Sequence, residues 1–272
     1  MIKLIYICDY ADFIMQAKFK QNGYVFIKNF FSQAEVDALV ADIKEASATK
    51  SDNDVLDKGN LKFHALIMHR SEKLRAFISQ PKIVDFLKQF TGPDIWVRWD
   101  QAVEKKPGAG TFPWHQDNQY SQLKDQHFQF WISLTTMTAD NGGLWVVPGS
   151  HKGMLKYDVE DNHVSYKGDV SNAEFISAEP GDIVLFSSFL LHSTTPNITQ
   201  KSRWAYVVEY MRMDAIDPYI EAPHLMIAKD GKPHLEYLDK IPNQDSWMNR
   251  YKYFSFKNKI KSSLKGIKQA VF

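Results

Sequence analysis

The feature that most constrains the fold is a series of short apolar runs that begins at about residue 94. The runs are rich in β-branched and aromatic residues: IWVRWDQAV, QHFQFWISL, LWVVPGS, DIVLFSS and RWAYVVEYM. Turn-forming stretches such as PGAG, DNGG and PGD separate them. Many short strands divided by turns are typical of a β-sandwich or a half-open barrel.

The residues before this series have a helical pattern around one strand. We expect a helix over 11–22 that an Asn-Gly pair ends, and a strand over 24–30. The apolar start of the chain is expected to be a strand or the beginning of that first helix. Ser32 and Glu35 have the spacing of a capping box, and 48–60 is expected to be a polar loop. The sequence therefore predicts an α+β fold: a double-stranded β-helix (jelly-roll, cupin-like) core with flanking N-terminal helices.

The last residues of the chain differ from the rest. No acidic residue follows Asp245, whereas 246–272 contain seven lysines and arginines, and apolar residues recur there at helical spacing. We therefore divide the chain into a single domain over 1–245 and a basic amphipathic C-terminal helix over 246–272. This helix either packs its apolar stripe on the domain or makes peripheral contact with an anionic membrane, and both interpretations stay open.

Charge and cysteine content narrow the range of partners and compartments. The net charge of +1 indicates no general attraction to nucleic acid, so no nucleic-acid partner is expected. The single cysteine, Cys8, excludes an intrachain disulfide and favours a reducing compartment. The apolar run at the start of the chain is too short to span a membrane and lacks a cleavage site. We expect a cytoplasmic protein, with peripheral membrane contact left open.

Three residues form a candidate metal site. His115 and Asp117 stand one residue apart in WHQDNQY, and on an extended strand such residues project to the same side. His192 lies in FLLHSTTPN, just after a PGD turn and the buried run IVLFSS, so it is the best third ligand. Two histidines and one carboxylate leave open positions on a ferrous ion, as in non-haem Fe(II) oxygenases. A zinc ion with the same ligands would keep one position for water.

An arginine further along the chain favours the iron interpretation. If 2-oxoglutarate binds the metal through its keto acid end, its far carboxylate needs a cationic partner, and arginine suits this best. Arg203 lies near the start of the run SRWAYVVEYM, eleven residues after His192. We expect the intervening turn to bring this strand antiparallel beside the His192 segment. Thr194 lies on the same side as His192 and can add a hydroxyl hydrogen bond to the carboxylate.

Four stretches together resemble the phytanoyl-CoA dioxygenase family of Fe(II)- and 2-oxoglutarate-dependent oxygenases. They are NGYVFIKNFFSQAEVDAL, WHQD, NGGLWVVPGSHKG and PGDIVLFSSFLLHSTTPNITQKSRWAYVVEY. They occur in the order and spacing of the family and cover roughly residues 15–212, so the basic tail lies outside the resemblance. Each stretch is weak evidence alone, and the combination is specific.

The resemblance implies a role for each matching position. His115, Asp117 and His192 match the iron ligands, and Arg203 matches the arginine that holds the 2-oxoglutarate tail, with the Thr194 hydroxyl beside it. Related halogenases lack the carboxylate, so the presence of Asp117 favours hydroxylation. Further positions near the cosubstrate are Gln101, Gln116, Trp131 and Lys62. The first candidates for substrate contact, in the loop after the ligand strand, are Asn118 and Tyr120.

The implied activity uses Fe(II), 2-oxoglutarate and O2, with ascorbate as an activator in vitro. It would hydroxylate an unactivated C–H bond of a small-molecule or lipid-linked substrate and release succinate and CO2. Two alternatives remain. A zinc-dependent hydrolase could use the same ligands, but no motif position supplies an obvious general base, and Arg203 would have no role. A non-catalytic jelly-roll binding protein is the other, and the intact ligand set argues against it.

Overall fold

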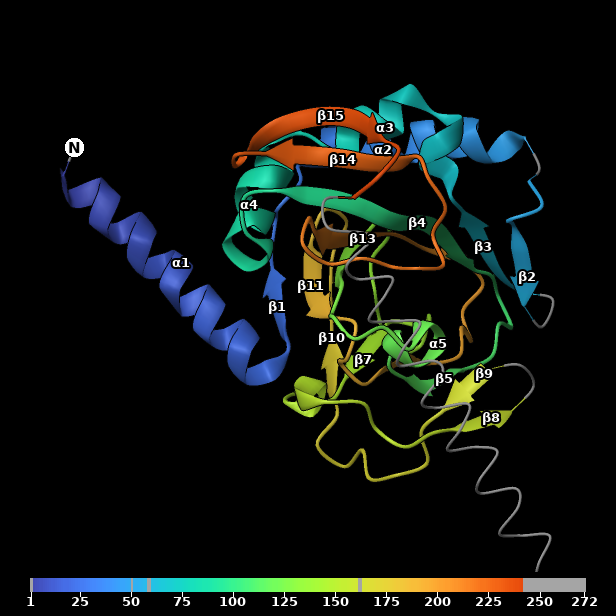
Figure 1. Cartoon of the computed structure of the whole chain (residues 1–272). Helices are drawn as coiled ribbons and strands as arrows, with labels where there is room; N and C mark the ends of the chain where they lie inside the picture. The colour runs from blue at the N-terminus through green and yellow to red at the C-terminus, as the bar shows by residue number, and fades with distance from the viewer. Residues whose placement is uncertain (1, 50, 58–59, 161–162, 242–272) are drawn as a thin grey trace, which may run out of the picture.

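Two β-sheets form the centre of the molecule, and helices from the N-terminal part of the chain cover the larger one (Figure 1). This computed structural model describes residues 2–49, 51–57, 60–160 and 163–241. The predicted basic helix over 246–272 lies outside the described residues, so that prediction remains a prediction. Within the described ranges, no helix combines the length and the apolar character that crossing a bilayer requires.

The larger sheet has nine strands, and all of its pairings are antiparallel. Seven of them lie side by side in the order β1 (Tyr24–Ile27), β11 (Ile183–Ser187), β6 (Phe128–Ser133), β13 (Arg203–Arg212), β4 (Ile95–Lys105), β14 (His224–Lys229) and β15 (Lys232–Leu238). The other two are β3 (Leu61–Ala65), which pairs with β4, and β2 (Val55–Asp57), which pairs with β3.

The smaller sheet has four strands in the order β10 (Glu174–Ile176), β7 (Leu144–Val146), β12 (His192–Thr194) and β5 (Phe112–His115). A separate hairpin joins β8 (Asp158–Glu160) to β9 (His163–Ser165). From β10 to β13, successive strands alternate between the smaller and the larger sheet. This alternation between facing sheets confirms the predicted jelly-roll core, because turns between the short strands repeatedly carry the chain across the sandwich.

The helices are α1 (Ile2–Asn22), α2 (Gln33–Ala48), η1 (Ile67–Arg70), α3 (Glu72–Ile78), α4 (Pro81–Thr91), α5 (Asn118–Ser121) and η2 (Ser150–Lys152), and α1 contains the helix predicted over 11–22. The capping box is present: Ser32 Oγ accepts a hydrogen bond from the Glu35 amide at 3.3 Å, and the Glu35 carboxylate accepts one from the Ser32 amide at 2.7 Å. The helix α1 begins earlier than expected, and Figure 1 shows it extending away from the sheets.

The expectation of an uninterrupted loop over 48–60 was wrong. Strand β2 lies within this range and pairs with β3, so that Val55 stands opposite Phe63 and Leu56 opposite Lys62. The two apolar residues Val55 and Leu56 suit a strand next to an existing partner, even though polar residues surround them. Tertiary pairing therefore overrides the polar local composition.

Two hydrophobic clusters lie on opposite faces of the larger sheet. On β13, Tyr206 and Val208 face the helices, where they pack with α2 and α4. Ala205 and Val207 face the smaller sheet and pack with residues such as Leu144. Side chains alternate along a strand, so Arg203, Ala205, Val207 and Glu209 all face the smaller sheet. We call this side of the larger sheet the inner face, and it carries part of the candidate site.

Candidate metal centre

Strand pairing brings the two candidate histidines together. His192 at the start of β12 is the register partner of His115 at the end of β5. Their ring centroids are 4.1 Å apart, and both side chains are buried. The residues are distant in sequence, so only the smaller sheet makes them neighbours.

Asp117 reaches the same point by a turn rather than along a strand. The strand β5 ends at His115, and Asp117 has helical dihedral angles (φ −55°, ψ −35°) at the N-cap of α5. The expectation that His115 and Asp117 share one extended strand was therefore wrong. The tight turn into α5 carries the carboxylate back over the strand end, which produces the same proximity by another route.

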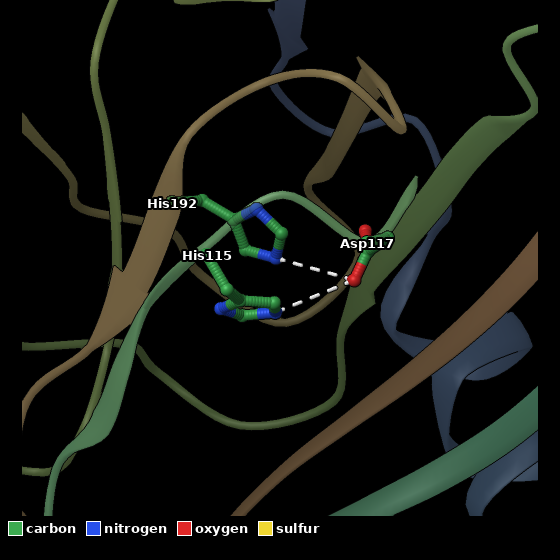
Figure 2. Close-up of side chains that lie close together, drawn as sticks. All are labelled: His115, Asp117 and His192. Atoms are coloured by element: carbon green, nitrogen blue, oxygen red, sulfur yellow. Dashed lines mark ion pairs between the residues drawn. The ribbon is translucent and has the colours of Figure 1, made fainter. Parts of the chain in front are cut away.

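The three side chains converge on one point (Figure 2). Asp117 Oδ1 lies 3.4 Å from His115 Nε2 and 3.7 Å from His192 Nε2. All three ligand atoms lie within 4.8 Å of one another, and among the described residues no other group of histidines, cysteines and acids meets this condition. This geometry suits a single ion that both imidazoles and the carboxylate ligate.

Backbone carbonyls orient the two imidazoles for metal binding. His115 Nδ1 lies 2.8 Å from the Pro113 carbonyl oxygen, and His192 Nδ1 lies 2.9 Å from the Leu190 carbonyl oxygen. A carbonyl only accepts, so each Nδ1 carries the proton and donates it. The lone pair is then on Nε2, which is the atom that faces Asp117.

The charge states also suit a divalent cation. Burial, followed by repulsion from His115, lowers the pKa of His192 to about 4, so this imidazole is neutral at pH 7. Burial works to raise the pKa of Asp117, but the attraction of His192 and the contact with His115 outweigh it and hold that pKa below its usual range. Neutral imidazole and ionised carboxylate are the forms that bind metal.

Arg203 is a buried cation that has no acidic partner in the part of the chain that the structure describes. Its side chain is 2 % exposed, and Nη2 donates a hydrogen bond to the Gly142 carbonyl at 2.7 Å. The Nε atom is buried without a partner among the described residues. Burial lowers the pKa of Arg203 to about 10, so the guanidinium is still charged at neutral pH. A buried charge of this kind is costly unless an anion joins it.

Lys105 and Thr194 lie near this arginine. In the β13–β4 register Lys105 is the partner of Arg203, and Lys105 Nζ donates a hydrogen bond to Thr194 Oγ1 at 2.9 Å. Lys105 is fully buried, and the sequence analysis missed it. The available signal was alternation: Gln101, Val103 and Lys105 follow each other at every second position of one strand, so they share a face.

We expected the strand that Arg203 begins to lie beside the His192 segment, and this expectation was wrong. β13 belongs to the larger sheet between β6 and β4, whereas β12 belongs to the smaller sheet between β7 and β5. The turn after Thr194 crosses the sandwich instead of forming a hairpin within one sheet. The hydrogen bond between Lys105 and Thr194 shows that these two segments face each other across the interior.

Lys62 points away from this group. It stands opposite Glu104 in the β3–β4 register, one residue away from the Leu61–Lys105 pair. Neighbouring positions on a strand face opposite sides, so Lys62 lies on the other face from Lys105, near His64. The structure therefore separates Lys62 from Arg203, contrary to its assignment near the cosubstrate.

Gln101 and Trp131 both lie on the inner face. Each is a register partner of Val207, Gln101 from β4 and Trp131 from β6. Trp131 and Val207 belong to the apolar cluster between the two sheets. Their location agrees with the predicted positions near the cosubstrate, and the contact itself remains a prediction.

Gln116 uses its amide to hold backbone segments. Its Nε2 donates to the Gly153 carbonyl at 2.9 Å and contacts the Phe189 carbonyl, and its Oε1 accepts from the Leu155 amide at 2.8 Å. With both ends of the amide engaged, the side chain is a structural clamp around the metal ligands. This disagrees with the expectation that Gln116 contacts the cosubstrate.

Asn118 and Tyr120 differ in what they offer a substrate. Asn118 is buried, and both ends of its amide bind the backbone of Leu123. Nδ2 donates to the Leu123 carbonyl at 2.8 Å, and Oδ1 accepts from the Leu123 amide at 3.2 Å. That side chain holds the loop after α5, which disagrees with the expected substrate contact. Tyr120 is 46 % exposed, and its ring centroid lies 5.8 Å from that of His115, so it flanks the metal centre.

Comparisons with known proteins agree with this geometry. The family profile of Phytanoyl-CoA dioxygenase (PhyH) matches residues 19–205. A probable alpha-ketoglutarate-dependent hypophosphite dioxygenase of Stutzerimonas stutzeri is 27 % identical over 74 % of this chain and 78 % of its own length. A methylphosphonate hydroxylase of Gimesia maris is also 27 % identical, over 71 % of this chain and 78 % of its own.

Solved structures show the same fold. The non-haem alpha-ketoglutarate-dependent epimerase SnoN from nogalamycin biosynthesis superposes with a TM-score of 0.66 at 16 % identity, over 85 % of this chain and all of its own. The segment that the family profile matches includes the His-Asp-His cluster and Arg203. The chain therefore belongs to the phytanoyl-CoA dioxygenase family and is an iron- and 2-oxoglutarate-dependent dioxygenase.

Proposed function

We propose that this dioxygenase hydroxylates an unactivated C–H bond of a small-molecule or lipid-linked substrate and releases succinate and CO2. His115, Asp117 and His192 hold the Fe(II), since their three ligand atoms lie within 4.8 Å of one another. The observation that carries the proposal is the buried charge of Arg203. This arginine has no acidic partner among the described residues, and it lies on the face of the larger sheet that is turned toward the smaller sheet with its metal ligands.

Arg203 binds the far carboxylate of 2-oxoglutarate in this proposal. The guanidinium is pre-positioned by its hydrogen bond to Gly142, and its buried Nε still has a proton to donate. Thr194 supplies a hydroxyl, and Lys105 adds a second positive charge. An arginine that forms two charge-assisted hydrogen bonds fixes both the position and the orientation of a carboxylate.

The remaining inner-face residues shape the reaction space. Gln101 and Trp131 flank Val207 on the inner face of the larger sheet, which supports their predicted role beside the cosubstrate. Tyr120 covers the His115 side and helps to keep water from the reacting groups. When bound, iron and 2-oxoglutarate supply the oxidative chemistry, and the protein positions the C–H bond.

The test is succinate formation by the full-length protein supplied with Fe(II), 2-oxoglutarate, ascorbate and O2. We expect slow succinate release even without substrate, and loss of this release when Zn²⁺ replaces Fe(II). Arg203→Met should abolish it at ordinary 2-oxoglutarate concentrations, whereas Arg212→Met should not. Arg212 is an exposed arginine at the other end of the same strand, and it pairs with Asp214. Turnover that is equal in both variants would contradict the proposed role of Arg203.

The boundaries and the tail extend the proposal. We propose that residues 1–245 form the single catalytic domain and that the basic segment 246–272 makes peripheral contact with an anionic membrane. The charge of that segment supports this, because seven basic residues occur there without an acid. A cytoplasmic location agrees with the single cysteine and is part of the same proposal.

A further inference from the structure

A network of charged side chains lies on the inner face beyond the metal ligands. Arg98 of β4 donates from Nε to Asp217 Oδ2 at 2.6 Å and from Nη2 to Ser121 Oγ at 2.7 Å, and its Nη1 contacts Glu209 Oε2. Two carboxylates therefore surround one guanidinium, which leaves the network with a net charge of −1 (+1 and −2). All three guanidinium nitrogens of Arg98 are engaged, so it offers little to an anionic ligand.

Two buried side chains beside Glu209 carry nitrogen atoms that have no hydrogen-bond partner among the described residues. Gln129 is 2 % exposed, and its Nε2 has no acceptor. His127 is fully buried, and neither ring nitrogen forms a hydrogen bond. Gln129 is the direct register partner of Glu209, and His127 Nε2 lies 3.4 Å from Glu209 Oε2. An unsatisfied buried polar group destabilises the protein, so a ligand that satisfies these groups binds favourably.

These groups adjoin the metal ligands. Phe186 stands opposite Gln129 on β11, and its ring centroid lies 4.9 Å from that of His192. Ser188 donates to the His127 carbonyl at 2.9 Å and accepts from the Asn118 amide at 3.0 Å, so it ties His127 to the residue after Asp117. The cluster is therefore next to Asp117, whose side chain keeps 22 % exposure.

The cluster is separate from the proposed cosubstrate anchor. Glu209 and Arg203 lie on the same face of β13, six positions apart, which corresponds to about 20 Å at the rise of a strand. Arg203 therefore marks one end of the inner face and Glu209 the other. A C–H bond to be oxidised must lie at the metal, and the rest of the substrate can extend toward Glu209.

We propose that Glu209, Gln129 and His127 bind the substrate, and that this substrate is an uncharged compound with a hydroxyl group. A hydroxyl group can both accept a hydrogen bond from the Gln129 amide and donate one to the neighbouring Glu209 carboxylate. This inference rests on the proposed oxygenase function and names the substrate class of the same site. Burial lowers the pKa of His127, so the imidazole adds no positive charge at neutral pH.

The charge of the cluster argues against a small phosphorus anion. A phosphonate would meet the net negative charge of Arg98, Glu209 and Asp217, and the described residues of the cluster hold no further cation. Like charges at close range in a poorly solvated space repel each other strongly and oppose binding. The substrate of this chain therefore differs from the hypophosphite and methylphosphonate that the names of two relatives specify.

The experiment compares two classes of probe on the full-length protein with Fe(II) and 2-oxoglutarate. Methyl glucoside and glycerol represent hydroxyl compounds, and methylphosphonate represents the anions. Binding is followed without O2 by the visible absorption of the iron–2-oxoglutarate complex, and succinate release is followed with O2. We expect the hydroxyl compounds to perturb the spectrum and accelerate succinate release at concentrations where methylphosphonate has no effect. An equal or larger effect of methylphosphonate, or no difference between the classes, would overturn the proposal.

Two variants test the residues. Gln129→Leu keeps the size of the side chain and should weaken binding of the hydroxyl probes at least tenfold, and Glu209→Gln should weaken their preference over methylphosphonate. Glu104→Gln is the matched control, since Glu104 lies on the opposite face of β4 and accepts from Ser202 at 2.9 Å. If Glu209→Gln fails to fold, Gln129→Leu alone tests the proposal. Unchanged binding of the hydroxyl probes by Gln129→Leu would then refute it. Succinate release by the wild-type protein without any probe tests the oxygenase function separately.

Discussion

Replacement of Arg203 by methionine should raise the stability of the protein and weaken cosubstrate binding by at least about a hundredfold. Burial lowers the pKa of this arginine to about 10 in the folded protein, which corresponds to roughly 3 kcal/mol against the charged form. Because the folded-state pKa is lowered, this cost is present at every pH below about 10. Loss of the hydrogen bond to Gly142 removes about 1 kcal/mol, so Arg203→Met should gain about 2 kcal/mol in the free energy of unfolding.

The same change should weaken 2-oxoglutarate binding strongly. Two charge-assisted hydrogen bonds at about 1.5–3 kcal/mol each give a total of about 3–6 kcal/mol, or a factor of at least one hundred in Kd. Urea unfolding with and without 2-oxoglutarate measures both quantities. The wild-type protein should gain about 2.7 kcal/mol at a ligand concentration of one hundred times Kd, and the variant should gain nothing at that concentration.

Arg203→Met should raise the free energy of unfolding and at the same time lower the affinity for 2-oxoglutarate, and this combination makes the prediction informative. An arginine that serves the fold would lose stability on replacement by methionine and leave 2-oxoglutarate affinity unchanged. That outcome would refute the reasoning from the buried, acid-free charge. Arg212→Met is the control, because this exposed arginine of the same strand should change neither quantity appreciably.

Four further predictions follow from particular residues. Asp117→Ala should weaken Fe(II) binding in calorimetry and abolish succinate release, with the fold retained in circular dichroism; iron binding as tight as in the wild type would contradict the ligand role. Burial raises the pKa of Asp100 to about 7, so its contribution to stability is lost as pH rises from about 4 to about 7; Asp100→Asn should therefore be more stable than wild type at pH 8, by at most about 4 kcal/mol, and no more stable at pH 4 in urea unfolding. Gln116→Leu should lower stability by about 3 kcal/mol, because it leaves buried backbone groups unpaired; an unchanged unfolding midpoint would show that the clamp is unimportant. Removal of the residues after Asp245 should eliminate salt-sensitive binding to anionic vesicles, and equal, negligible binding by both forms would remove the membrane proposal.

Much of the architecture could be read from local patterns. The strand runs, the Ser32–Glu35 capping box and the helix over 11–22 depend on residues that are close in sequence, and the structure has all of them. The His-x-Asp motif and His192 were recognisable because metal chemistry demands particular side chains and the motif order matches a family. Arg203 followed from the need of a dicarboxylate for a cation.

What the structure alone decided is the facing and engagement of individual side chains. Lys105 faces the interior together with its register partner Leu61. Lys62, the next residue on β3, faces the other side, because neighbouring residues of a strand face opposite sides. Gln116 and Asn118 satisfy backbone groups of loops that no local pattern predicts.

The sequence by itself determined which chemical groups the chain has and which strands and helices its segments form, since these depend on side-chain type and short-range spacing. The tertiary structure decided which of those groups share the interior. Register, the crossing of the chain between sheets and the turn at Asp117 arise from pairings between distant segments. The cluster of Glu209, Gln129 and His127 became visible only when those pairings were known.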